Sequence, residues 1–170
     1  MLTYTSTPTS LTDGMESLQK LTQLTHLSLK DCIVSSGDLK IIANLPALTN
    51  LTLNECNLSN IENLSSATKL TTLDLSSNAI RDLSPLTFIS SLESLNLSHN
   101  ALTSLNAISS LSGLKVLDIS YNSLESVAPL SALTELQELY CSNNAIATLL
   151  GMDNLVNLAV LDASFNALTD

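Results

Sequence analysis

Apolar and polar residues alternate along this chain in a pattern that returns at a fixed interval. The pattern Leu-x-x-Leu-x-Leu, with Ile, Cys and Ala as the sixth residue in the last three copies, begins at seven places, separated by 24 residues once and by 22 residues thereafter. These starts are Leu24, Leu48, Leu70, Leu92, Leu114, Leu136 and Leu158. Such a period is typical of a solenoid, in which each repeat forms one rung that packs on the next. The rungs are numbered one to seven from these starts, and position one is the first leucine of a rung.

Each repeat contains a short stretch of alternating character. In rung three, Leu73 and Leu75 occupy positions four and six and flank the polar Asp74. A period of two is that of a strand, so positions four and six should point into the core and position five away from it. We therefore predict one parallel strand per rung, all in a single sheet. Their centres should lie near Leu27, Leu51, Leu73, Leu95, Leu117, Leu139 and Leu161.

Position nine carries an amide or a thiol in every rung. The residues are Cys32, Cys56, Asn78, Asn100, Asn122, Asn144 and Asn166. Where the chain leaves the strand, backbone groups lose their partners, and a buried asparagine amide offers both donors and acceptors to replace them. We predict a structural ladder of these side chains along the solenoid. The alternative is that the asparagines are surface sites for a glycan or a ligand.

The segments that return from one strand to the next differ between rung one and the others. Ser35 to Asp38, followed by Leu39 to Ala43, predicts an N-cap and a short helix. The other return segments are rich in Ser, Thr and Asn and contain Pro85 and Pro129, so we expect turns or 3₁₀ pieces there. Because a helix needs more circumference than such turns, the solenoid should curve with its strands on the concave face.

The repeats predict a single domain over residues 1–170. Residues 1–23 should form a degenerate N-terminal rung, residues 24–157 six full repeats, and residues 158–170 a partial repeat. In the N-terminal rung, Leu2, Thr5 and Thr7 fall on strand core positions, while Met15, Leu18 and Leu21 fit the return side. Solenoids need capped ends. We therefore expect either that the natural chain continues or that Asp170 ends a short, partly exposed rung, which a second copy could cover by association through the uncapped ends.

Composition and charge narrow the classes of function. The chain is 45% hydrophobic and 13% charged, which excludes a disordered chain. The formal net charge of −10 argues against nucleic acid and against anionic membrane surfaces as partners. The apolar runs are too short to insert into a membrane. The first residues carry neither the basic nor the apolar region of a signal peptide, which leaves the compartment open.

The repeat resembles those of two groups of leucine-rich-repeat proteins. The run from Leu70 to Ile80, with Asp82-Leu83-Ser84-Pro85-Leu86 on the return, is similar to the 22-residue repeats of bacterial internalins. It is also similar to the repeats of eukaryotic phosphatase-1 regulatory subunits. The resemblance covers residues 24–170 and implies an α/β repeat solenoid, a horseshoe or arc. Its parallel sheet would line the concave face, with turns, 3₁₀ pieces and one short helix on the convex face. Both groups bind proteins, although different ones.

Catalysis would need side chains that converge, and the repeat separates them. His26 and His99 lie three rungs apart, roughly 14 Å at about 4.8 Å per strand. Asp74, Asp118 and Asp162 recur in every second rung, roughly 10 Å apart, which is too far for shared metal ligation. We therefore predict no enzyme activity, no metal site and no cofactor.

The three cysteines fit the repeat as small core residues. Cys32 and Cys56 take position nine, and Cys141 replaces the leucine of position six. We predict buried, unreactive thiols. A disulfide between Cys32 and Cys56 is the alternative, since they stack in adjacent rungs, although neighbouring parallel strands seldom meet its geometry.

The concave face is the predicted binding surface, formed by positions three, five, seven and eight. Aromatic residues gather on its C-terminal half, where the fold does not require them, and aromatics often anchor interfaces. The candidate partner-binding residues are Asp74, Asn96, His99, Asp118, Tyr121, Glu138, Tyr140, Asp162 and Phe165. Their acidic members favour a protein partner with a basic surface. The alternative is that these are ordinary solvated strand residues on a face without a partner.

The sequence favours a non-catalytic protein-recognition scaffold, part of a bacterial surface or secreted protein. The high content of Ser and Thr and the excess of acidic residues favour a surface or secreted protein. An intracellular, cytoplasmic regulatory subunit that docks on an enzyme is one alternative, which reduced cysteines would suit. The other is a structural spacer in a larger chain.

Overall fold

The fold is a row of rungs joined by one parallel sheet. The computed structural model describes residues 2–5 and 15–169, with side chains from residue 15 onward. Eight strands follow one another in chain order, each hydrogen-bonded in parallel to the next. The strands are β1 (Leu2–Thr5), β2 (His26–Lys30), β3 (Asn50–Asn54), β4 (Thr72–Asp74), β5 (Ser94–Asn96), β6 (Val116–Asp118), β7 (Glu138–Tyr140) and β8 (Val160–Asp162). The predicted single sheet is confirmed.

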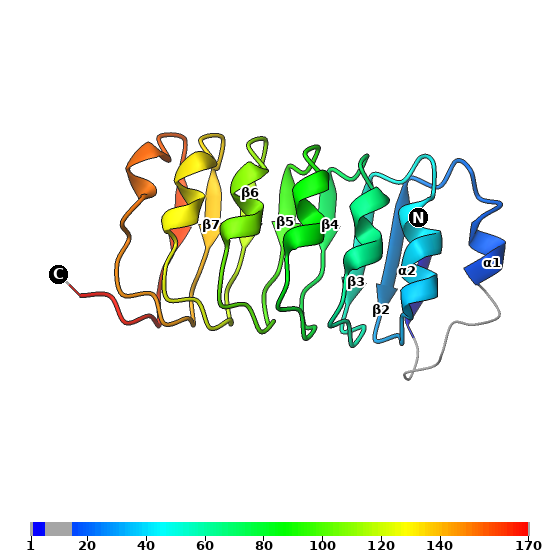
Figure 1. Cartoon of the computed structure of the whole chain (residues 1–170), viewed down its shortest axis with the longest axis horizontal. Coiled ribbons are helices and arrows are strands. Elements are labelled where there is room, and N and C mark those ends of the chain that lie inside the picture. The colour runs from blue at the N-terminus through cyan, green and yellow to red at the C-terminus, as the bar shows by residue number, and fades with distance from the viewer. Residues whose placement is uncertain (1, 6–14, 170) are drawn as a thin grey trace.

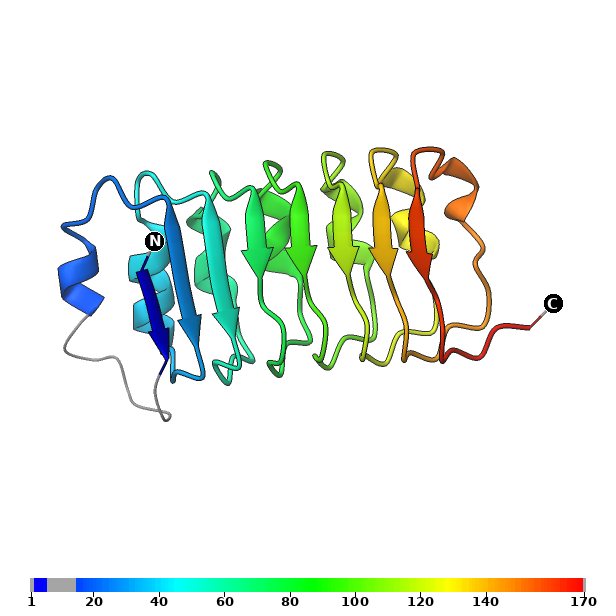
Figure 2. The ribbon, with the colours of Figure 1, turned by 180° about the vertical axis from the view of Figure 1, so that it is seen from behind.

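The register of the strands confirms the period read from the sequence. Leu51 pairs with Leu73, and the same position-four leucine pairs with its neighbour in each later rung, up to Leu139 with Leu161. The strands line one side of the molecule and the helical turns line the other, as the two opposite views show (Figure 1, Figure 2). The strand side is the concave face of the predicted solenoid arc.

The return segments divide into α-helices at the N-terminal end and 3₁₀ turns elsewhere. The α-helices are α1 (Met15–Leu18) and α2 (Ser36–Ala43), and the 3₁₀ turns are η1 (Glu62–Ser66), η2 (Ser84–Phe88), η3 (Asn106–Ser110), η4 (Ala128–Ala132) and η5 (Met152–Asn154). The predicted cap of α2 is confirmed. Ser35 Oγ accepts a hydrogen bond from the Asp38 amide, and the Asp38 carboxylate accepts one from the Ser35 amide. This reciprocal pair is a capping box.

The core is a stack of aliphatic layers, one per rung. Positions four and six are buried from rung one to rung six; Leu73 at position four is 1% exposed and Leu75 at position six is 0% exposed. The apolar residues of the return segments, such as Ile80, Leu83 and Leu86, close the other side of the same layer. No single layer is large, so the stability of each rung depends on the rungs beside it.

The register predicted for the N-terminal rung is wrong. Leu2 pairs with Leu27 and Tyr4 with Leu29, so Leu2 and Tyr4, rather than Thr5, align with the core positions of rung one. Thr7 lies outside the described residues. The paired residues are 25 apart rather than 22. The connection to rung one contains α1, and the 22-residue count does not extend across it.

The outermost layers are only partly covered. Met15 and Leu18 are buried as predicted, but Leu21 is 43% exposed because it lies in the first layer. At the other end, Leu161 is 43% exposed, whereas its equivalents in rungs one to six are almost fully buried. Val160 and Leu168 of rung seven are also exposed. Among the described residues, no further layer covers rung seven.

Candidate binding surface

The concave face is built from positions three, five and eight of each strand. Side chains at positions three and five are half-buried along the middle of the sheet, as for Thr72 and Asp74. Position seven was also expected on this face, and the Ser76, Ser98 and Ser120 hydroxyls do bond to the side chains of position five there. The serines of position seven in the central rungs are buried, with 5–8% exposure; they are Ser76, Ser98, Ser120 and Ser142.

The acidic and amide residues at position five have a structural partner inside their own rung. Asp74 Oδ1 accepts hydrogen bonds from the Ser76 amide at 2.9 Å and the Ser76 hydroxyl at 2.6 Å. The same two bonds join Asn96 to Ser98, Asp118 to Ser120 and Asp162 to Ser164. These bonds lower the pKa of Asp162 below its ordinary value, the Ser164 hydroxyl contributing most. The recurring Asp/Asn-x-Ser run is visible in the sequence, but these bonds were not predicted, because positions five and seven were assigned only to the binding face.

Position eight adopts a left-handed backbone conformation in every rung. The φ angles lie between 53° and 57° at Asp31, Glu55, Ser77, His99, Tyr121, Asn143 and Phe165. Asn, Asp and Gly tolerate this region, whereas bulky side chains are strained there. The left-handed backbone therefore disfavours Tyr121 and Phe165, whereas histidine, like asparagine and aspartate, is common in this region.

The structure brings two of the predicted binding residues into direct contact. The rings of His99 and Tyr121 stack across adjacent rungs, with centroids 4.1 Å apart and planes 11° apart. Tyr121 is 49% exposed and Phe165 79% exposed. They share the position-eight column, with Asn143 between them. The sequence had grouped the three larger aromatics, so the pairing of His99 with Tyr121 was not predicted.

Tyr140 occupies position five of rung six, and its side chain is half-buried. Its hydroxyl donates a hydrogen bond to Glu138 Oε2 at 2.9 Å. That bond, together with the nearby carboxylates of Glu138, Asp118 and Asp162, raises the pKa of Tyr140 above its ordinary value. Tyr140 therefore lies in an acidic setting and is held by one of its carboxylates.

The position-nine asparagines link each rung to the one before it. Asn100 Nδ2 donates to the carbonyls of Leu75 in rung three and of Leu97 in its own rung, at 3.0 and 3.1 Å. Its Oδ1 accepts from the Ile80 amide at 2.9 Å. The equivalent bonds recur at Asn78, Asn122, Asn144 and Asn166. These side chains are half-buried rather than fully buried, and their amide groups are occupied by the fold.

The cysteines are buried, and the structure contains them as free thiols. Cys56 takes the place of an asparagine, and its Sγ donates weakly to the carbonyls of Asn54 and Leu29 at 3.4 and 3.6 Å. Burial raises the pKa of both Cys56 and Cys141 to about 11. Because a thiolate rather than a thiol is the nucleophile, these sulfurs are poor nucleophiles in the folded protein.

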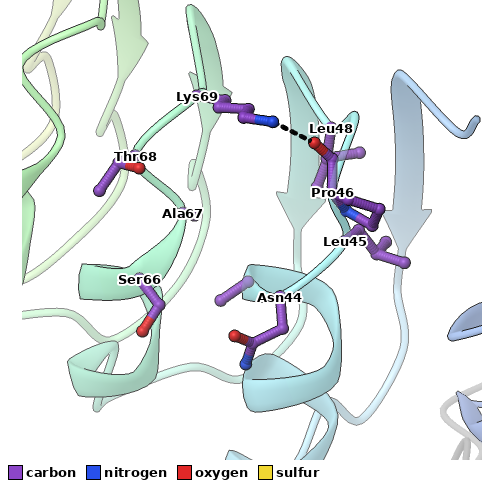
Figure 3. Close-up of a pocket in the computed structure, with 9 residues that line it drawn as sticks. Asn44, Leu45, Pro46, Leu48, Ser66, Ala67, Thr68 and Lys69 are labelled. Atoms are coloured by element: carbon purple, nitrogen blue, oxygen red, sulfur yellow. Dashed lines mark hydrogen bonds between the residues drawn. The ribbon is translucent and has the colours of Figure 1, made fainter. Parts of the chain in front are cut away.

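Pockets also lie outside the C-terminal half of the concave face. One lies between α2 and η1, and its charged lining residue, Lys69, already donates to the Pro46 carbonyl at 2.6 Å (Figure 3). Another lies on the N-terminal half of the concave face, where neutral polar side chains such as Ser28 and Asn50 accompany His26. Within residues 2–5 and 15–169, no group of three His, Cys, Asp or Glu side chains is placed to hold a metal ion. The same residues include no helix with the length and apolar character needed to cross a membrane.

Comparisons with known proteins agree with the geometry of the rungs. A family model described as leucine rich repeat matches residues 46–102 and 68–124, and a second model of leucine rich repeats in two copies matches residues 112–155. The matches together span more than half of the chain. A search of curated proteins finds no significant match.

Solved structures extend the likeness to almost the whole chain. Internalin C2 of Listeria monocytogenes is 29% identical, with a TM-score of 0.89, over 98% of this chain and 71% of that one. A second internalin of that organism is 29% identical, with a TM-score of 0.71, over 90% of this chain and 52% of that one. An LRR protein of Leptospira interrogans is 25% identical, with a TM-score of 0.79, over 91% of this chain and 46% of that one. The chain therefore belongs to the leucine-rich repeat proteins, and its repeats are internalin-like.

Proposed function

We propose that this chain is a non-catalytic scaffold that binds a partner protein through the C-terminal half of its concave face. Leucine-rich repeat proteins are in general protein-interaction scaffolds. The observation that carries the proposal is the strain at position eight. Tyr121 and Phe165 have bulky rings on a left-handed backbone, where Asn143 shows the residue type that the fold accommodates readily. Both rings are also exposed, and exposed aromatic rings are suited to an interface.

The acidic side chains around these rings indicate the charge of the proposed partner. Asp118, Glu138 and Asp162 lie on the same half of the face, and Asp74 and Asn96 extend it toward the N-terminal end. Their charge favours a partner with a basic surface and should mainly govern the association rate. Because Asp74, Asn96, Asp118 and Asp162 also hold their own strand ends, substituting them would affect folding as well as binding.

A photo-crosslinking residue placed at Asn143, between Tyr121 and Phe165, tests the proposal. The matched control is the same residue at Phe88, which is 65% exposed on η2 of the convex side. The proposal expects a partner protein to be captured from position 143 and not from position 88. Capture from position 88 alone would contradict it, and capture from neither position would favour a structural spacer.

The captured partner then allows the contact residues to be measured. Tyr121→Asn and Phe165→Asn should each weaken binding by about 30-fold, the effect of a typical hot-spot residue. Phe88→Ala should leave the affinity unchanged. Because asparagine suits a left-handed backbone, neither asparagine variant should lose stability for that reason. Variants of the concave face that fold and bind like the original protein would overturn the assignment.

The setting of this interaction is part of the same proposal. Likeness to internalin structures supports a bacterial surface or secreted protein. Free thiols support the second candidate, an intracellular subunit that docks on an enzyme. Protease treatment of intact producing cells, followed by detection of the chain, separates the two. Degradation supports the first setting, and protection until the cells are lysed supports the second.

A further inference from the structure

Tyr140 departs from the pattern that position five otherwise follows in the C-terminal rungs. In rungs three, four, five and seven, an Asp or Asn at this position bonds to the serine two residues later. Tyr140 has no carboxylate or amide to offer Ser142, so rung six gives up that pair of bonds. The phenol hydroxyl binds Glu138 instead. In rung six, an aromatic ring held on the concave face therefore takes the place of an Asp or Asn that would bond to the strand end.

Carboxylates surround this ring on three sides. Asp118 in β6 and Asp162 in β8 are the direct register partners of Tyr140. Glu138 lies two residues earlier in the same strand, which places it on the same face. These four residues are here termed the Tyr140 site. At positions three, five and eight of rungs four to seven, no residue is Lys or Arg, so no cation of the concave face neutralises the site.

The chemistry of the site suits one kind of occupant. An aromatic ring attracts a cation to its face, and flanking carboxylates accept its hydrogen bonds. A bare metal ion does not fit, because no His, Cys, Asp or Glu cluster of the described chain has metal-binding geometry. A guanidinium group is planar, stacks on rings and bonds to carboxylates through several N–H groups at once, which an ammonium group does less well.

We propose that the Tyr140 site binds an arginine side chain of the partner protein. This inference rests on the proposed function and names the contact within it. One face of the guanidinium would lie on the phenol ring, and its N–H groups would donate to one of the flanking carboxylates, that of Asp118 or that of Asp162. Glu138 would keep the ring in place through the tyrosine hydroxyl. Position five of rung six would then be a specificity-determining position.

The test is an NMR titration of the full chain at low ionic strength. The probes are N-acetyl-arginine amide and N-acetyl-citrulline amide, which have similar shapes but differ in charge. The arginine probe should shift the backbone amide signals of residues 118, 138, 140 and 162 saturably, at least about tenfold more tightly than the citrulline probe. Equal responses to the two probes, or arginine shifts centred elsewhere on the molecule, would overturn the inference.

Two variants separate the ring from the surrounding charge. Tyr140→Phe keeps the ring and should retain most of the arginine response. Tyr140→Asn removes the ring but matches Asn96 of rung four, so it should regain the bonds to the local serine and remain folded, as circular dichroism would verify. Loss of the arginine response in Tyr140→Asn is expected. An unchanged response would mean that the carboxylates act only as a diffuse acidic surface, and the site as described would be wrong.

The arginine contact and the proposed function can be tested independently of each other. If a partner is captured at Asn143 but binds Tyr140→Asn as tightly as the original chain, the arginine contact is wrong and the concave-face interaction stands. If the arginine probe binds at residues 118–162 but crosslinking yields no partner, the site exists and the proposed function fails.

Discussion

At position nine, the asparagine side chain replaces the backbone partners that are lost where each strand ends. Each amide bonds to its own rung and to the preceding one, as Asn100 does with Leu97 and Leu75. The residue type was informative in the sequence, because few side chains offer donors and acceptors together. The Asp-x-Ser bonds also satisfy polar groups near a strand end. They join positions five and seven, which look independent in the sequence when each position is considered alone.

Substitution of Asn100 by Ala should therefore be more costly than substitution of a surface asparagine. It removes one acceptor and several donated bonds and leaves backbone groups unpaired, at about 1–3 kcal/mol. The control is Asn106→Ala, an exposed residue of η3, which should change the free energy of unfolding by less than about 0.5 kcal/mol. Urea denaturation measures both, and equal losses at the two sites would contradict the assigned role.

Substitution of Ser164 by Ala should raise the pKa of Asp162 toward its ordinary value. The Ser164 hydroxyl is the largest cause of the lowered pKa, and its bond to Asp162 Oδ1 is 2.6 Å long. A lowered pKa in the folded state stabilises the fold above the pKa of the unfolded chain. That stabilisation is lost as the pH falls through the folded value. NMR titration of the Asp162 carboxyl carbon tests this, with Ser112→Ala on a return segment as the control; an unchanged pKa in Ser164→Ala would refute it.

At the scale of elements, the return segments set the length of each rung. Rungs that return through 3₁₀ turns take 22 residues, the rung with α2 takes 24, and the connection with α1 takes 25. The apolar period was sufficient to predict strands β2 to β8, and the N-cap residues that begin at Ser35 predicted α2. It could not give the register of β1, because α1 breaks the 22-residue count. Nor could it give the left-handed residues, because φ at position eight depends on how the strand end meets the turn.

The capping box of α2 should contribute measurably to stability. Ser35→Ala removes the hydroxyl that accepts from the Asp38 amide, and typical N-cap losses are about 1 kcal/mol. Ser36→Ala, the next residue, is also exposed and lies inside the helix, so it should cost little. Thermal and urea unfolding of the two variants provide the comparison. A loss at Ser36 as large as that at Ser35 would show that the cap is not the cause.

At the scale of the whole molecule, the rungs are equivalent in sequence but unequal in burial. Leu117 and Leu161 occupy the same position, yet their exposures are 0% and 43%. Leu117→Ala should cost about 2–5 kcal/mol, as for other fully buried leucines, and Leu161→Ala less than half of that. Denaturant unfolding compares the two variants. Similar losses would mean that rung seven is as well packed as rung five.

The three buried thiols allow the local unfolding of individual rungs to be followed in time. Cys32 and Cys56 lie in rungs one and two, and Cys141 lies in rung six, beside the partly covered rung seven. A maleimide should label each sulfur only after its own rung opens, because burial keeps both the access and the thiolate fraction low. Mass spectrometry of timed samples should find Cys141 labelled before Cys56, and equal rates would mean that the rungs open together. The order in which the cysteines are labelled therefore shows at which end of the unaltered chain unfolding begins.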